Sequence, residues 1–242
     1  MVMNDQNMTG KGIWAVVALK SPDTAKSRLR PLLSDAERRD LYFIMARKVI
    51  GALKATPQFE RVMVVTADAE VENFALRLGA EVIRQAEDGG TAAAFSHALA
   101  SFNSNLPGRV LLIPGDLPLI SRAALEQLIE RSADFSGVCI VPDRKRVGTN
   151  ALLCSPPDAI PPCFGVRSFD KHLAAARERG IDARVIESET LSLDIDVADD
   201  LALLGAHYLS LPDHVDIVLR DLLVRLRSGE VVSVESKNVH SH

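Results

Sequence analysis

The chain has 242 residues, which is within the range of a single α/β domain with extensions. Its 47% hydrophobic and 25% charged residues are typical of a soluble globular protein, and the formal net charge of −4 argues against bulk attraction to nucleic acid. No apolar run reaches the roughly 20 residues of a membrane-spanning helix and residues 1–12 lack a signal-peptide pattern, so we expect a cytoplasmic protein.

Short apolar runs rich in β-branched residues alternate with helical patterns along the chain. This alternation predicts a Rossmann-like α/β fold with a mostly parallel sheet flanked by helices. The expected strands are Ile13–Leu19, Arg61–Thr66, Glu81–Arg84, Val110–Pro114, Val138–Val141, Ala151–Cys154 and one within Leu191–Asp196. The expected helices are 35–53 after a Ser34–Glu37 capping box, Ala69–Leu78 after Asp68, Thr91–Phe102, Arg122–Arg131 after Ser121 and Phe169–Arg179 after Ser168.

The C-terminal part has a different pattern. Apolar residues recur there at helical spacing on an otherwise charged segment, which predicts an amphipathic helix. They are Val215, Val218, Leu219, Leu222 and Leu226. This helix either packs on its own domain or forms a homodimer interface. We therefore divide the chain into a flexible N-terminus (1–12), an α/β domain (13–206), a helical extension (207–229) and a disordered tail (230–242).

Asp116 directly follows the apolar run that ends at Pro114, and Gly115 and Pro118 flank it. Ligands of open α/β sheets bind in the crevice at the carboxyl ends of the strands. A carboxylate beside anionic phosphates is favourable there when a divalent cation lies between them. Asp116 therefore predicts a nucleotide–metal site.

A basic loop follows the first expected strand. Lys20, Lys26 and Arg28 fall within nine residues, and both ammonium and guanidinium groups bind phosphate. Because phosphates bind after the first strand of doubly wound sheets, we expect phosphate contact here, with a solvated loop as the alternative. The loop has neither a Walker A nor a GxGxxG pattern, which disfavours kinase-like and dinucleotide-binding functions. Gly89 and Gly90 precede the helix expected at Thr91 and could let backbone approach a ligand, or form an ordinary turn.

Asp194 and Asp196 lie two residues apart in the last expected strand, so both carboxylates would face the same side. Like charges at this distance repel each other unless a cation or protons intervene. We therefore expect them to share a magnesium site with Asp116, and a solvated edge strand ending in acids is the alternative. Asp199 and Asp200 are expected to cap the next helix.

A third region combines a basic loop, Arg144–Asn150, with the segment Cys163–Phe169. Backbone donors at the helix start expected after Ser168 could hold a phosphate or a carboxylate. Together these pieces predict a site for a small anionic substrate. The cysteines have no metal-ligand spacing and are expected to be reduced thiols, namely Cys139, Cys154 and Cys163.

These motifs together resemble the guanylyltransferases of coenzyme F420 biosynthesis, the CofC/FbiD family within the MobA-like nucleotidyltransferases. The resemblance covers about residues 13–204. The matching segments are Lys20 with Lys26-Ser-Arg-Leu29, Gly89-Gly90, Gly115-Asp-Leu-Pro118, Gly148-Thr-Asn150, Phe164-Gly165 with Ser168-Phe169, and Asp194-Ile-Asp196.

The resemblance implies a GTP-dependent nucleotidyltransferase that acts on a phosphorylated three-carbon acid. It implies acid contacts at Thr149, Gly165 and Ser168, and it implies that Asp116, Asp194 and Asp196 are ligands of one or two magnesium ions. Nucleotide contacts are expected from Lys20, Lys26, Arg28, Gly89, Gly90 and Asp116, and the first three with Asp116 are the expected catalytic residues. Relatives use 2-phospho-L-lactate, phosphoenolpyruvate or 3-phospho-D-glycerate.

The chain departs from the family pattern where Thr91-Ala92 replaces a common Leu-Asn, which indicates an altered pocket that Cys154 could also line. The reaction expected is transfer of GMP from GTP to the acid, with pyrophosphate leaving. A molybdenum-cofactor or sugar nucleotidyltransferase is disfavoured because the loop from Lys20 to Arg28 has no glycine. A non-catalytic nucleotide-binding regulator is a further alternative, and it would bind nucleotide without turnover.

Overall fold

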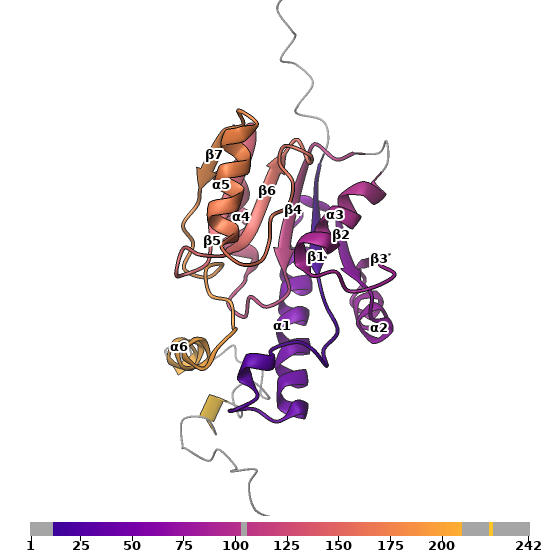
Figure 1. The fold of residues 1–242 in the computed structure, drawn as a ribbon, viewed down its shortest axis with the longest axis vertical. Helices are drawn as coiled ribbons and strands as arrows, with labels where there is room; N and C mark the ends of the chain where they lie inside the picture. Colours follow the sequence, from indigo (N-terminus) through magenta and orange to yellow (C-terminus); the bar gives the residue numbers. More distant parts are fainter. Residues whose placement is uncertain (1–11, 103–105, 210–222, 225–242) are drawn as a thin grey trace, which may run out of the picture.

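The structure is a computed structural model that describes residues 12–102, 106–209 and 223–224. Its centre is a seven-stranded sheet in the order β3-β2-β1-β4-β6-β5-β7 (Figure 1). Within this sheet β6 runs antiparallel to β4 and β5, and the other neighbours are parallel. The strands are β1 (Ile13–Ala18), β2 (Phe59–Thr66), β3 (Glu81–Arg84), β4 (Arg109–Pro114), β5 (Gly137–Pro142), β6 (Thr149–Ser155) and β7 (Ala183–Val185).

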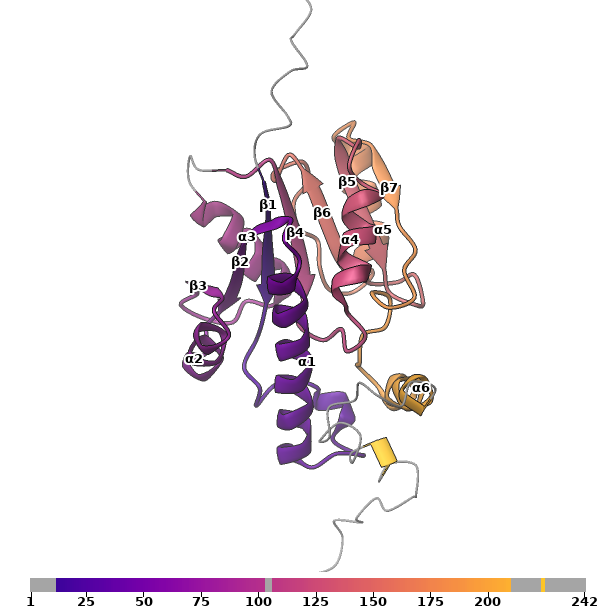
Figure 2. The ribbon, with the colours of Figure 1, turned by 180° about the vertical axis from the view of Figure 1, so that it is seen from behind.

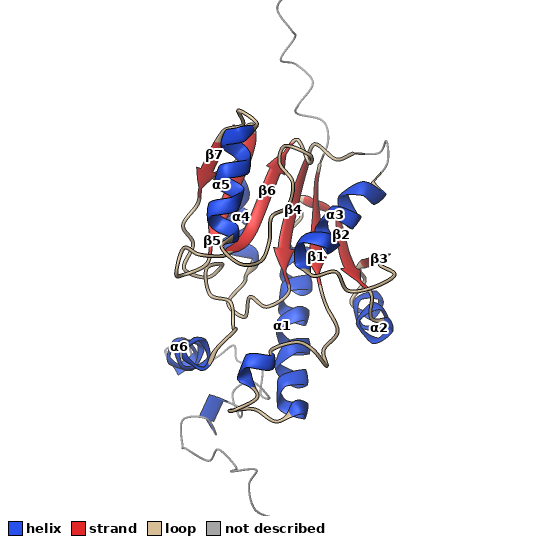
Figure 3. Ribbon diagram, in the orientation of Figure 1, coloured by secondary structure: helices blue, strands red, loops and turns tan. Residues whose placement is uncertain are grey.

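Helices cover both faces of the sheet. Helices α1 and α4 lie on one face, with α2 beside the β3 edge, and α3 and α5 lie on the other face (Figures 1 and 2). Helix α6 lies beyond the carboxyl ends of β1 and β4 (Figure 3). The helices are α1 (Asp35–Ala55), α2 (Ala69–Arg77), α3 (Thr91–Ser101), α4 (Arg122–Glu130), α5 (Ser168–Glu178) and α6 (Ala198–Leu209), with a 3-10 helix η1 (Ser27–Leu29).

Strand β1 shows why the sheet is buried on both faces. Its side chains alternate between two hydrophobic clusters, with Ala15 and Val17 in one and Trp14 and Val16 in the other. The first cluster includes side chains of α1, α2 and α4, and the second includes those of α3 and α5. A strand covered on both sides needs a continuous apolar run, which is the pattern that predicted it.

A third hydrophobic cluster lies outside the sheet and fixes the segment before α6. It contains Leu29 of η1, Met45 of α1, Leu193 and Ile195 of the segment before α6, and Leu204 of α6. Burial of such side chains stabilises by about 1.5–3 kcal/mol each. This cluster therefore attaches the loop after β1 and the segment before α6 to the same part of α1.

The predicted fold class is confirmed, and several helix starts carry the predicted caps. Ser34 and Glu37 form the reciprocal capping box of α1. Asp68 accepts hydrogen bonds from the backbone N–H groups of Glu70 and Val71, and Ser121 accepts one from that of Ala124. Each cap satisfies donors that the first helical turn leaves without partners.

Two predicted elements are wrong. Residues 191–196 form no strand, because no described strand pairs with them, and the strand at that end of the chain is β7. Ser168 does not cap α5. Arg167 is the N-cap residue, without a side-chain bond, and Ser168 is the first helical residue.

Further outcomes concern single positions. Asp199 and Asp200 lie in the first turn of α6 rather than before it, although one Asp200 oxygen accepts the backbone N–H groups of Asp196 and Val197. Cys154 is fully buried in the core rather than lining a cavity. The predicted amphipathic helix falls almost entirely outside the described residues. Among the described residues, no helix has both the length and the apolarity needed to cross a membrane.

Candidate functional site

Asp116 lies immediately beyond the carboxyl end of β4, where the chain turns at Gly115. A Cβ atom on Gly115 would lie 2.1 Å from Leu19 Cδ2, so a larger residue here would force the buried Leu19 side chain to move. This close approach brings Asp116 beside the loop that follows β1.

The loop after β1 is held in place by residues of α1. The hydroxyl of Tyr42 donates to the carbonyl of Lys20 at 2.6 Å, and burial raises the pKa of Tyr42, so the phenol remains a donor. The guanidinium of Arg38 donates to the carbonyl of Ala25 at 3.0 Å. Lys26 then adopts a left-handed backbone conformation with φ of 54°, which is costly for a residue other than glycine. The surrounding contacts thus fix a strained backbone that directs the Lys26 side chain inward.

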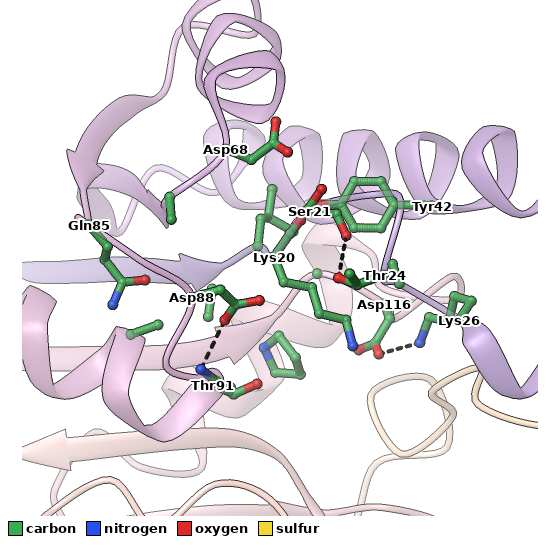
Figure 4. A pocket seen from close by; sticks show the side chains of 18 of the residues that line it. Lys20, Ser21, Thr24, Lys26, Tyr42, Asp68, Gln85, Asp88, Thr91 and Asp116 are labelled. Atoms are coloured by element: carbon green, nitrogen blue, oxygen red, sulfur yellow. Dashed lines mark hydrogen bonds and ion pairs between the residues drawn. The ribbon is translucent and has the colours of Figure 1, made fainter.

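Lys26 joins two acidic residues that are distant in the sequence. Its Nζ lies 2.6 Å from Asp116 Oδ2 and 3.1 Å from Asp196 Oδ1, across separations of 90 and 170 residues (Figure 4 shows the bond to Asp116). Burial alone would lower the pKa of Lys26, but Asp116 and Asp196 outweigh it and raise the pKa. Burial would likewise raise the pKa of Asp196, but the Lys26 ammonium lowers it. Both shifts favour the charged forms, so this is an ion pair.

Asp194 is the third carboxylate of this cluster. Burial, followed by the charges of Asp116 and Asp196, raises its pKa to about 7. The Asn150 side chain donates to Asp194 Oδ1 at 3.4 Å and to the Leu191 carbonyl at 3.1 Å. Asp194 is therefore near enough to feel the charges of Asp116 and Asp196, although the strand that was expected to align Asp194 with Asp196 does not exist.

A divalent cation fits the chemistry of these carboxylates but not their present arrangement, in which Lys26 lies between two of them. Asp116 Oδ1 is buried and has no hydrogen-bond partner among the described residues, and carboxylate oxygens are preferred magnesium ligands. In the described part of the chain, no three or more His, Cys, Asp or Glu side chains are arranged to hold a metal ion. The Lys26 ammonium bridges two of these carboxylates, Asp116 and Asp196.

A cavity of about 780 Å³ opens beside this cluster at the carboxyl ends of β1 and β4. Lys20, Lys26, Gly90, Asp116 and Asp196 line it, so most of the predicted nucleotide contacts come together. Ser21, Thr24, Tyr42, Asp68, Gln85, Asp88 and Thr91 also line this cavity (Figure 4). Its size fits a nucleotide, since ligand pockets span roughly 300–1,000 Å³.

The N-terminus of α3 lies at the edge of the large cavity. Gly90 caps this helix with φ of 83°, a conformation that glycine adopts without strain. The Asp88 carboxylate accepts the Gly90 N–H at 2.9 Å, which fixes the turn. Gly89 is exposed and is not among the lining residues of this cavity. Free N–H groups at such a helix start favour an anionic ligand.

A second cavity of about 210 Å³ shares Asp196 with the first. Arg28 and Asp194 line this smaller cavity rather than the large one. Arg28 Nη1 lies 3.9 Å from Asp196 Oδ2, and its side chain is 71% exposed. The predicted phosphate-binding cations are therefore divided between two adjoining cavities.

The residues expected to contact the acid are only partly accessible. Thr149 and Ser168 are buried and in contact, since the Thr149 N–H donates to Ser168 Oγ at 2.8 Å. Neither is among the residues that line the two cavities, whereas Gly165 is exposed in the loop before α5. Ser168 is therefore held by β6 rather than by the start of its own helix.

His172 is a buried residue that the sequence patterns did not single out. The Cys163 N–H donates to its Nε2 at 2.8 Å, so Nδ1 carries the proton and donates to Thr149 Oγ1 at 2.9 Å. Burial lowers the pKa of His172 to about 4, so the ring is neutral at pH 7. The only sequence signal for a role of His172 was its position one helical turn after Ser168, on the buried face of α5. Tyr42 was missed as well, because it lies in the apolar stripe of α1.

Residues 13–210 match the family described as "Guanylyl transferase CofC like". The phosphoenolpyruvate guanylyltransferase of Rubrobacter xylanophilus is 40% identical over 194 residues, covering 80% of this chain and 94% of that protein. The 3-phospho-D-glycerate guanylyltransferase of Colwellia psychrerythraea is 36% identical, covering 78% and 90%. A nucleotidyl transferase structure from Methanothermobacter thermautotrophicus has a TM-score of 0.61 at 20% identity, covering 83% and 99%.

Proposed function

The chain belongs to the CofC-like guanylyl transferase family, and on this basis we propose that it transfers GMP from GTP to a phosphorylated three-carbon acid in coenzyme F420 biosynthesis. One observation carries the proposal. Segments 90 and 170 residues apart bring Asp116, Lys26 and Asp196 together at the edge of a nucleotide-sized cavity.

In the proposed reaction a phosphate oxygen of the acid attacks the α-phosphorus of GTP. A new P–O bond forms there, and the bond from the α-phosphorus to the bridging oxygen of the β-phosphate breaks. The bonding electrons leave with pyrophosphate. Because the attacking phosphate is already ionised near neutral pH, no general base is required, and catalysis depends on positioning and on charge stabilisation.

The triphosphate fits the large cavity, with its charge near Lys20, Lys26 and the N-terminus of α3. Arg28, on the other side of Asp196, would face the reacting α-phosphate. Lys26 would contact phosphate in place of one of its present carboxylate partners. The other carboxylate partner, partly buried like the first, keeps the Lys26 ammonium beside it while the nucleotide binds.

Asp116, Asp194 and Asp196 would hold magnesium, whose chemistry is to neutralise and align the reacting phosphates. The buried, unpaired Oδ1 of Asp116 supports this assignment. The guanine preference and the choice of acid rest on the names of relatives that act on phosphoenolpyruvate and 3-phospho-D-glycerate. Contacts of the acid with Thr149, Gly165 and Ser168 remain part of the proposal.

The decisive experiment is a matrix of four NTPs against phosphoenolpyruvate, 2-phospho-L-lactate and 3-phospho-D-glycerate, each with magnesium. Pyrophosphate release and product mass are measured for every pair. We expect turnover with GTP and one of the acids. A nucleotide-binding regulator would bind GTP without releasing pyrophosphate, and a sugar or molybdenum-cofactor enzyme would not use any of the phospho-acids.

Two finer parts of the proposal concern assembly and location. The amphipathic stripe from Val215 to Leu226 favours a homodimer, which sedimentation velocity of the full chain would detect.

A cytoplasmic location fits the use of GTP and the free thiols, which are Cys139, Cys154 and Cys163.

A further inference from the structure

His172 lies at the centre of a buried hydrogen-bond network that includes residues proposed to contact the acid. Its side chain is fully buried on α5, and its ring packs edge-on against Phe164 with the ring centres 5.0 Å apart. The Cys163 N–H donates to Nε2 at 2.8 Å, and Nδ1 lies 2.9 Å from Thr149 Oγ1. One side chain of α5 therefore connects the first residue of β6 with the loop that precedes α5.

These contacts fix the direction of the hydrogen bonds around His172. A neutral imidazole has one N–H and one bare nitrogen, and Nε2 is the bare nitrogen because it accepts the Cys163 N–H. Burial lowers the pKa of His172 to about 4, so the ring does not gain a second N–H near neutral pH. Nδ1–H then donates to Thr149 Oγ1, and the hydroxyl proton of Thr149 has to point elsewhere.

The hydroxyls of Thr149 and Ser168 both accept a hydrogen bond and both keep a proton to donate. Ser168 Oγ accepts the Thr149 N–H at 2.8 Å. Within the described residues neither hydroxyl proton has an acceptor, although Thr149 is only 5% exposed and Ser168 only 2%. Because a buried polar group without a partner is unfavourable, both hydroxyls are suited to donate to an anionic ligand.

The backbone donors at the start of α5 are already in use. The Ser168 N–H donates to the Gly165 carbonyl, and the Phe169 N–H donates to the Val147 carbonyl, both at 3.1 Å. The sequence suggested such helix-start donors for an anionic substrate. Since these two N–H groups have partners, an acid can use the hydroxyls of Thr149 and Ser168 without displacing an existing hydrogen bond.

We propose that His172 is a positioning residue that directs the Thr149 hydroxyl proton towards an anionic oxygen of the phosphorylated acid. This assignment rests on the proposed guanylyl transfer and on contact of the acid with Thr149. Because His172 is fully buried, it acts through Thr149 rather than by contact with a substrate. It keeps the Thr149 hydroxyl a donor, which favours an anionic group at this point of the acid.

We expect selective effects on the KM for the acid. Losing a hydrogen bond to a charged group corresponds to about 10- to 100-fold in affinity, so Thr149→Val should raise this KM by that amount. His172→Phe keeps a buried ring but donates nothing to Thr149, and it should raise the KM about 5- to 10-fold, the size of one neutral hydrogen bond. The KM for GTP should change less than about 2-fold, because neither residue lines the large cavity.

A double-mutant cycle separates this role from a purely structural one. In the Thr149→Val background the hydroxyl that His172 directs is absent, so adding His172→Phe should raise the KM for the acid by less than about 2-fold more. His172→Asn places an amide near the position of Nδ1 and should recover part of the loss by donating to Thr149. The control is Leu173→Ala, which removes apolar packing from the same helix and should lower stability with the KM for the acid unchanged within about 2-fold.

The tautomer of His172 can be measured in the wild type without any substitution. Two-bond ¹H–¹⁵N NMR identifies which ring nitrogen carries the proton. We expect the Nδ1–H tautomer at pH 7, both in the free protein and with the acid bound. The Nε2–H tautomer would overturn the proposal, because Thr149 would then donate to Nδ1 rather than to the acid.

Failure of the proposed function and failure of this assignment give different results. If the wild type releases no pyrophosphate with any acid, the guanylyl transfer itself fails. If the wild type turns over and either His172→Phe or Thr149→Val keeps the wild-type KM for the acid, the role of His172 is wrong. Equal increases in the KM values for acid and GTP, or increases that multiply in the double variant, also overturn it. Should His172→Phe unfold, His172→Asn and the tautomer decide.

Discussion

Replacing Lys26 by methionine removes the ammonium that holds Asp116 and Asp196 together while keeping nearly the same side-chain length. The Lys26 side chain is only 6% exposed, and its Nζ lies 2.6 and 3.1 Å from the two carboxylates. Two neighbouring acids would lose their counter-charge beside Asp194, whose pKa is already raised to about 7 by burial and by those same two charges. We expect the metal-free protein to be destabilised.

The structure sets the size of this effect. Breaking one side of a fully buried ion pair costs about 3–5 kcal/mol. Asp116 and Asp196 are 26% and 49% exposed, so water screens part of the remaining repulsion, and we expect about 2 kcal/mol. Urea denaturation of the metal-free and nucleotide-free protein measures this loss. Lys171→Met, on the exposed side of α5, is the matched control and is expected to stay within about 0.5 kcal/mol of wild type.

Magnesium or manganese should reverse the effect in the variant. Without the Lys26 ammonium, Asp116 and Asp196 lose their counter-charge and a divalent cation is no longer repelled by Lys26, so Lys26→Met should bind Mn²⁺ more tightly than wild type in the absence of nucleotide. A cation concentration of about 100 times the Kd would raise the free energy of unfolding by about 2.7 kcal/mol, which is enough to restore the stability of the variant. Manganese binding is read by electron paramagnetic resonance, independently of activity. A variant as stable as wild type without metal, or with no gain in manganese affinity, would refute this reasoning.

Three further predictions concern Asp116, Gly115 and His172. Asp116→Asn should lower magnesium-dependent pyrophosphate release by about 100-fold or more with an unchanged circular dichroism spectrum, and near-normal turnover would contradict the metal assignment. Gly115→Ala should cost about 1–3 kcal/mol in urea denaturation, because its Cβ would lie 2.1 Å from Leu19 Cδ2, and the cost should shrink in a Leu19→Ala background. His172 has a pKa near 4 when folded and 6.5 when unfolded, so its contribution is present above pH 6.5 and is lost as the pH falls towards 4. The wild type should therefore lose about 3 kcal/mol more than His172→Phe between pH 7 and pH 4, and parallel profiles would contradict this.

The fold could be predicted because local signals and burial agree over most of the chain. The continuous apolar run of β1 is buried on both faces, and the capping box at Ser34 marks the start of α1. The cap of α5 could not be predicted from the same local signal. Arg167 is the N-cap residue, and Ser168 is the first helical residue, whose Oγ accepts a hydrogen bond from the Thr149 N–H on β6.

The candidate site was predictable in its residue types but not in its internal contacts. Acids and cations after strands identified Asp116 and Lys26, because the carboxyl ends of parallel strands meet at one edge of the sheet. Nothing in the sequence indicated that Lys26 would bridge Asp116 and Asp196. That contact depends on a left-handed backbone at Lys26, which follows from tertiary contacts of the loop such as the bond from Arg38 to the Ala25 carbonyl. Such a conformation leaves no pattern in a single sequence.

The positions of Asp194 and Asp196 depend on a different feature from the one we expected. We expected a strand to present them on one side, and the structure has none there. The alternation of residue types still orders the segment, because Leu193 and Ile195 are buried in the cluster between α1 and α6. Burial of those two apolar side chains leaves the alternating carboxylates outside the cluster, where Asp196 pairs with Lys26 and the Asn150 side chain donates to Asp194. Hydrophobic burial, rather than backbone pairing in a sheet, is therefore what holds two like charges together at this site.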